Sequence, residues 1–78
     1  MILIDITKYE IIIKRHVFEQ AVLRGIHPDM IEQALLKGKI ERFGKNGVKF
    51  VNRGSKKIII CVGEMTGNNI KIITIEVK

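Results

Sequence analysis

Residues 39–77 read KIERFGKNGVKFVNRGSKKIIICVGEMTGNNIKIITIEV, and this stretch decides the fold. Four runs rich in β-branched and aromatic residues, which favour strands, alternate with short segments of glycine, asparagine, serine and lysine. Segments of this composition supply the backbone conformations that hairpin turns require. The pattern therefore predicts an antiparallel meander of four strands at residues 39–43, 48–53, 58–65 and 70–77.

The chain before residue 39 shows helical periodicity. Apolar residues at positions 17, 18, 21 and 22 predict a helix that begins at Arg15 and ends at Gly25, a residue that tolerates positive φ. A second helix is expected to follow, with Pro28 at its first position and Gly38 at its end. Residues 9–14 suit a strand, and residues 2–6 are a further candidate.

This order predicts an α+β fold of one domain, residues 1–78, in which two helices pack on one face of a twisted antiparallel sheet of four or five strands. In the last strand, simple alternation separates the side chains into two sets. The sets are Ile73, Ile75 and Val77 on one face and Ile70, Ile72, Thr74 and Glu76 on the other. Cys61 lies in a run that is apolar on both faces and is expected to be buried.

The composition excludes several classes of protein. The chain has 78 residues and a single cysteine, so neither an internal disulfide nor a cysteine-built zinc site is expected. Apolar runs are too short for a membrane span, and residues 1–5 lack the basic start of a signal peptide. The expectation is a cytoplasmic protein that binds no membrane, metal or cofactor.

Charge is distributed unevenly along the chain. Residues 37–57 carry eight basic residues and one acidic residue, whereas the remainder carries six basic and seven acidic residues. A basic segment joined to a nearly neutral one favours binding to a polyanion, of which RNA is the main candidate. The alternative is a lysine-rich solvated surface of the kind found in heat-adapted proteins. The predicted RNA-binding cations are Arg15, Lys39, Arg42, Lys45, Lys49, Lys56 and Lys57.

Two segments resemble a small bacterial and archaeal domain family of unknown function. Residues 14–26, KRHVFEQAVLRGI, are similar to its strand-to-helix opening, and residues 72–75, IITI, are similar to its last strand. The most specific positions are His16, Arg24, Gly25, Ile26 and Thr74. The family is grouped with RelE-type toxins that cleave messenger RNA and with barnase-like metal-independent ribonucleases. The resemblance implies a RelE-like fold with two helices on a curved antiparallel sheet.

The chain departs from that family at two positions. The family commonly has arginine where this chain has Gln20, and a small polar residue where it has Arg15. A helix-borne arginine is therefore missing at position 20, although Arg15 supplies a positive charge nearby along the sequence.

Metal-independent RNA cleavage needs a base, an acid and cations that stabilise the crowded phosphorus centre. His16 is the candidate base because imidazole titrates near neutrality; the alternative is a histidine that caps or packs at the helix start. Arg24 and Arg53 are candidate phosphate clamps because guanidinium groups bind phosphate through paired hydrogen bonds. Thr74 would hold a phosphate oxygen or the ribose, unless it is simply a strand residue.

These observations predict a metal-independent endoribonuclease, the toxin component of a toxin–antitoxin pair. Its expected partners are RNA, including ribosome-bound messenger RNA, and an acidic antitoxin protein or a second copy of the chain paired at the open sheet edge. The alternative is a catalytically inactive module on the same scaffold that binds RNA or protein.

Overall fold

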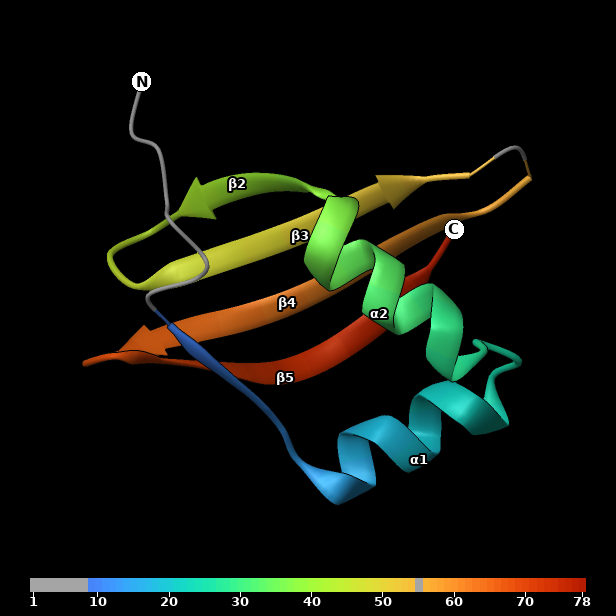
Figure 1. The fold of residues 1–78 in the computed structure, drawn as a ribbon, viewed down its shortest axis with the longest axis horizontal. Helices are drawn as coiled ribbons and strands as arrows, with labels where there is room; N and C mark the ends of the chain where they lie inside the picture. Colours follow the sequence, from blue (N-terminus) through green and yellow to red (C-terminus); the bar gives the residue numbers. More distant parts are fainter. Residues whose placement is uncertain (1–8, 55) are drawn as a thin grey trace.

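A computed structural model describes residues 9–54 and 56–78, and the predicted strand at residues 2–6 lies outside this part of the chain (Figure 1). The elements follow the predicted order, with bounds that differ from the predicted ones by a residue or two. They are β1 (Glu10–Ile13), α1 (Arg15–Leu23), α2 (Pro28–Lys37), β2 (Lys39–Phe43), β3 (Gly47–Arg53), β4 (Ile58–Thr66) and β5 (Asn69–Val77).

The five strands form one mixed sheet in the order β1-β5-β4-β3-β2. Strands β2 to β5 make the predicted antiparallel meander, but β1 joins β5 in parallel, from Glu10 opposite Asn69 to Ile13 opposite Ile72. The prediction of a purely antiparallel sheet is therefore wrong. Short turns force sequential strands to be antiparallel, whereas β1 and β5 are the first and last elements and share no connecting loop.

The chain reverses between the two helices through a glycine-dependent turn. Gly25 has φ of 86°, and its N–H donates to the Val22 carbonyl while the Ile26 N–H donates to the Ala21 carbonyl. This pair of bonds is the Schellman arrangement that satisfies the carbonyls at a helix end. It also places Ile26 in the core, where 1% of its surface is exposed. The predicted end of the first helix at Gly25 is confirmed.

The two helices pack over different strands of the sheet, and both contribute buried residues to one core. In Figure 1, α2 crosses in front of β3 and β4, whereas α1 runs alongside β5. β1 pairs only with Asn69–Ile72, so in the described part of the chain the following residues of β5 have no strand on that side, and α1 lies against them. Val17 and Ala21 of α1 are buried in the same core as Phe50 and Cys61.

A bulge in β5 changes which residues face the core. Val62 pairs with Thr74 and Gly63 pairs with Ile72, so Ile73 is left without a partner. Before the bulge Ile70 and Ile72 are buried, and after it Ile75 is buried, all on the helix-covered face. The predicted division of β5 into two alternating sets is wrong because one extra residue shifts the alternation by one position. Thr74 consequently lies on the opposite face.

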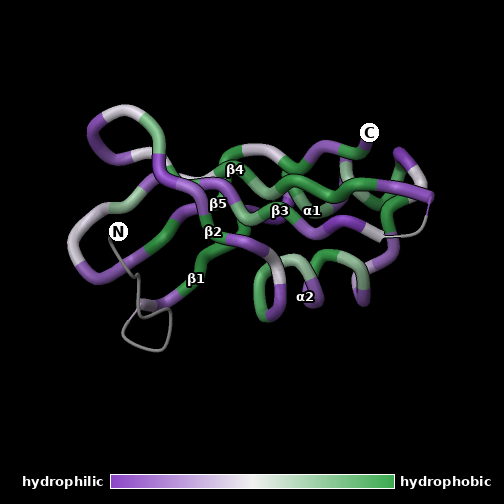
Figure 2. Tube along the Cα trace, turned by 90° about the horizontal axis from the view of Figure 1, so that it is seen from above, coloured by the Kyte–Doolittle hydropathy of each residue, from purple (hydrophilic) through white to green (hydrophobic). Residues whose placement is uncertain are grey.

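That opposite face, termed the open face here, is not covered by any helix of residues 9–54 and 56–78; Figure 2 shows α2 on the other side of the strands. Val48 and Phe50 point into the core, so Lys49, Val51 and Arg53 lie on the open face. Ile60 and Val62 of β4 pair with Val51 and Lys49, so these two half-buried side chains lie at the centre of the open face.

Candidate functional site

A small cleft of about 30 Å³ lies where α1 meets β5. On the helix side it is lined by His16, Gln20 and Arg24, which are spaced four residues apart and so lie along one helix face. On the strand side it is lined by Ile73, Thr74 and Ile75, the residues at the bulge. The cleft opens at the edge of the open face, because Thr74 lies on that face.

Three of the four predicted catalytic residues line this cleft, although 58 positions separate His16 from Thr74 in the sequence. His16 is exposed at the second position of α1, where Lys14 is the N-cap residue. His16 therefore neither caps the helix nor packs in the core, which were the alternatives to a chemical role. Thr74 is half-buried and reaches the cleft only because the bulge turns it to the open face.

Arg24 is fixed at one end of the cleft by a contact with the strand. Its Nη1 donates to the Ile75 carbonyl oxygen at 3.4 Å in a partly buried position. Ile75 pairs with β4 on one side, and β1 does not extend to it on the other side, so the arginine bonds to an acceptor at the edge of the sheet. A guanidinium group has five N–H donors, so one contact orients it and leaves others to bind an anion.

Arg15 and Arg53 lie outside the cleft. Arg15 Nε donates to Glu19 Oε1 at 2.8 Å on the exposed side of α1, so its charge is partly balanced and does not replace an arginine at Gln20. Arg53 on β3 pairs with Ile58 of β4, and Thr74 on β5 pairs with Val62 of β4. Ile58 and Val62 are four residues apart along β4. With strands ~4.8 Å apart and ~3.3 Å per residue, two strands and four residues separate Arg53 from Thr74 by about 16 Å.

Strand alternation divides the predicted RNA-binding cations among several surfaces. Lys39 and Lys49 lie on the open face, as does the predicted phosphate clamp Arg53, whereas Arg42 pairs with buried Val48 and lies on the helix-covered side. The others occupy the two turns at the ends of β3: Lys45 in one, and Lys56 and Lys57 in the other. The continuous basic segment of the sequence is therefore not a continuous basic surface.

Lys49 is the open-face cation in register with the cleft. It pairs with Val62, which pairs with Thr74, so Lys49 and Thr74 lie two strands apart in one row, at about 10 Å. Its Nζ lies 5.1 Å from the centroid of the Phe43 ring, a cation–π contact that holds the amine over β2. Acidic residues also lie on this face; Glu41 is opposite Lys49 on β2, and Glu76 is on β5 beyond Thr74.

Two further observations limit the chemistry available. Burial raises the pKa of the Cys61 thiol from its ordinary value of 9.0 to about 11, so this thiol stays protonated at neutral pH and is not a nucleophile. Within residues 9–54 and 56–78, no group of three or more His, Cys, Asp or Glu side chains could hold a metal ion. No helix in the same part of the chain is long and apolar enough to cross a membrane.

Gln20 was considered only as a departure from a family pattern, yet it lies between His16 and Arg24 in the cleft. The spacing of four residues on a helix is the sequence signal that relates these three side chains. No sequence signal indicated that Met30, Gln33 and Asn52 line a second cavity, because its walls come from separate elements.

Comparison of the chain with protein-family models, curated proteins and solved structures finds no match in any of the three.

Proposed function

We propose that the protein is a metal-independent endoribonuclease that acts at the cleft between α1 and β5. The observation that carries this proposal is that His16, Arg24 and Thr74 line one cleft beside a sheet face that bears cations. These side chains combine a base with two donors suited to phosphate oxygens, which are two of the three parts that metal-independent RNA cleavage needs; solvent would supply the acid.

In the proposed reaction, the imidazole of His16 accepts the proton of a ribose 2′-hydroxyl. The 2′-oxygen then attacks the adjacent phosphorus, the bond from phosphorus to the 5′-oxygen breaks, and a 2′,3′-cyclic phosphate forms. Arg24 and Thr74 donate hydrogen bonds to the non-bridging oxygens, where negative charge increases in the transition state. The departing 5′-oxygen takes a proton from solvent water, and His16 later returns its own proton to solvent.

The RNA strand would cross the open face from the cleft towards β3. Lys49, in the row of Thr74, and Lys39 and Arg53 on the same face would contact successive phosphates. Few aromatic side chains are available for base stacking, since the chain contains one tyrosine and three phenylalanines. Recognition would therefore depend mainly on the backbone of the strand and vary strongly with salt concentration.

Catalysis is expected to be slow on free RNA. The residues that line the cleft include one imidazole, that of His16, and no carboxyl or ammonium group. The proton of the leaving group must come from solvent, so the reaction lacks part of the roughly 10²- to 10⁴-fold gain that positioned acid–base groups supply. The same observation favours the second candidate function, an RNA-binding module that does not cleave.

A toxin role is part of the proposal and rests on the exposed edge of the sheet. Among residues 9–54 and 56–78, strand β2 pairs with β3 alone, and most residues of β2 are exposed. An unpaired edge can accept a strand from another chain, which would be an acidic antitoxin or a second copy of the protein.

Cleavage is tested with purified protein and a 5′-labelled single-stranded RNA in EDTA. We expect products that end in a 2′,3′-cyclic phosphate, and no cleavage where the scissile ribose is 2′-deoxy. His16→Ala should lower the rate at least about 100-fold, because it removes the base. His27→Ala is the matched control, since His27 occupies the N-cap position of α2 outside the cleft. Equal rates for the two variants, or cleavage that EDTA abolishes, would contradict the proposal.

Ribosome dependence and toxicity are tested in cells by inducing the wild type beside His16→Ala and mapping RNA 5′ ends. Growth arrest and new 5′ ends that require His16 would support a toxin. Harmless expression with intact RNA, combined with RNA binding in solution, would favour the non-cleaving module.

A further inference from the structure

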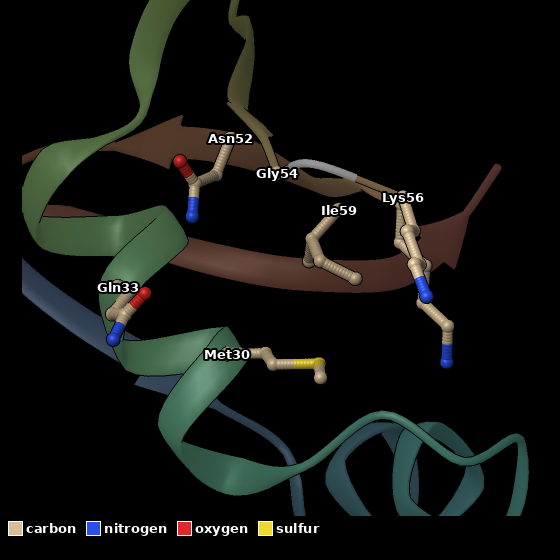
Figure 3. A pocket seen from close by; sticks show the side chains of 7 residues that line it. Met30, Gln33, Asn52, Gly54, Lys56 and Ile59 are labelled. Carbon is tan, nitrogen blue, oxygen red and sulfur yellow. The ribbon is translucent and has the colours of Figure 1, made fainter.

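A second cavity, of about 350 Å³, lies between α2 and the end of the β3–β4 hairpin. Figure 3 shows its walls: Met30 of α2 on one side, Ile59 of β4 facing it across the gap, and the side chain of Asn52 at one end. The volume falls within the range of small-molecule sites, which are mostly apolar pockets with a few placed polar groups.

The polar groups of this cavity are separated by kind. Two carboxamides, those of Gln33 on α2 and Asn52 on β3, lie at one end (Figure 3). Two amines, those of Lys56 and Lys57, come from the hairpin, and Figure 3 shows Lys56 at the other end of the cavity. No acidic side chain is among the lining residues. The cavity thus offers neutral donors and acceptors at one end, an apolar slot in the middle and positive charge at the other end.

We propose that this cavity binds a purine nucleotide. The base would lie in the slot between Met30 and Ile59, where a flat apolar ring replaces water. Asn52 and Gln33 would bond to its edge, since a carboxamide can pair with the adjacent donor and acceptor of adenine. Lys56 and Lys57 would bind the phosphate. Inorganic phosphate alone would leave the slot and both carboxamides unused, and an uncharged base would leave the lysines unused.

This site is separate from the cleft and its inference does not depend on RNA cleavage. Asn52 lies on the helix-covered side of the sheet, opposite the face that carries Thr74. A nucleotide can reach the cavity either as a free monophosphate or as the end of an RNA strand. Both sources present the same base and phosphate, and they are distinguished by their relative affinities.

The test is a titration of ¹⁵N-labelled protein with adenosine 5′-monophosphate, followed by NMR. We expect saturable binding with a Kd below about 1 mM and the largest shifts at the side-chain amides of Asn52 and Gln33. Adenosine and ribose 5-phosphate should each bind at least roughly tenfold more weakly, since each lacks one of the two recognised parts. A cleavage-resistant 2′-O-methyl oligoadenylate that binds more tightly than the monophosphate at the same amides would identify an RNA end as the ligand.

Variants separate this site from general charge attraction. Lys56→Gln with Lys57→Gln should weaken binding of the monophosphate by about tenfold, whereas Lys45→Gln with Lys71→Gln, which removes equal charge from residues outside the cavity, should not. Asn52→Leu, which keeps the side-chain volume, should weaken binding of the monophosphate to a similar extent. If Asn52→Leu fails to fold, the Lys56 and Lys57 variants serve as the test, because these residues lie on an exposed turn. Equal effects of both lysine pairs, or binding of ribose 5-phosphate as tight as that of the nucleotide, would overturn the proposal.

Discussion

Replacing Arg53 with glutamine should reduce the salt dependence of RNA binding, whereas replacing Arg42 should not. Both arginines are exposed and lie on neighbouring strands, but Arg53 is on the open face and Arg42 is on the helix-covered side. The two substitutions remove the same charge from the sequence. They differ only in the face of the sheet from which the charge is lost, so they test the proposed path of the strand.

The magnitude follows from the cations that the proposal places along the RNA. These are Lys39, Lys49 and Arg53 on the open face and Arg24 at the cleft. Binding to a single strand loses ~0.7 log units of affinity per tenfold rise in salt for each phosphate neutralised. Four contacts therefore give a slope of about −2.8 in a plot of the logarithm of the binding constant against the logarithm of the salt concentration. Between 50 and 200 mM salt the wild type should therefore bind about 50-fold more weakly, and Arg53→Gln, with a slope of about −2.1, about 20-fold more weakly.

Fluorescence anisotropy with a labelled 2′-O-methyl oligonucleotide measures these slopes without cleavage. Arg42→Gln should retain the wild-type slope within error. If the two variants lose the same slope, the open face is not the binding surface, and the affinity reflects net charge alone. A wild-type slope near zero would refute the polyanion interpretation itself.

Two predictions concern stability. Because burial raises the pKa of Cys61 to about 11, the buried thiol stabilises the folded chain fully below pH 9 and loses that contribution as the pH rises through 11. The free energy of unfolding, measured with urea, should fall by up to about 3 kcal/mol over this interval beyond any fall seen in Cys61→Ala. Identical pH dependence of the two proteins would contradict the assignment. Ile72→Thr should lower the free energy of unfolding by about 2 kcal/mol or more, and Ile73→Thr by under about 1 kcal/mol, because only Ile72 is buried. Similar losses would argue against the bulge.

The sequence was most informative where local chemistry acts on its own. The helix end at Gly25, the start of α2 at Pro28 and the meander from β2 to β5 were all predicted and are confirmed. Each depends on residues close together in the chain: a glycine that accepts positive φ, a proline with a preset φ, and turns too short for any pairing but an antiparallel one.

The candidate site was predicted less completely. His16, Arg24 and Thr74 were identified, and they line one cleft. Arg53 was expected beside them but lies about 16 Å from Thr74, because its position in a strand says nothing about which strand lies next to α1. The contiguous run of cations was likewise expected to bind one polyanion, but the pleat of the strands sends neighbouring side chains to opposite faces of the sheet.

The sequence alone determined the order of the elements, the burial of Cys61 in β4, and the reversal between the helices, because these follow from periodicity, from local hydrophobicity and from the dihedral preferences of single residues. Tertiary structure decided the parallel pairing of β1 with β5, the packing of α1 beside β5 and the bulge at Ile73. These features depend on which distant surfaces meet once the chain is compact, and a shift of one residue in one strand then places Thr74 on the open face rather than in the core.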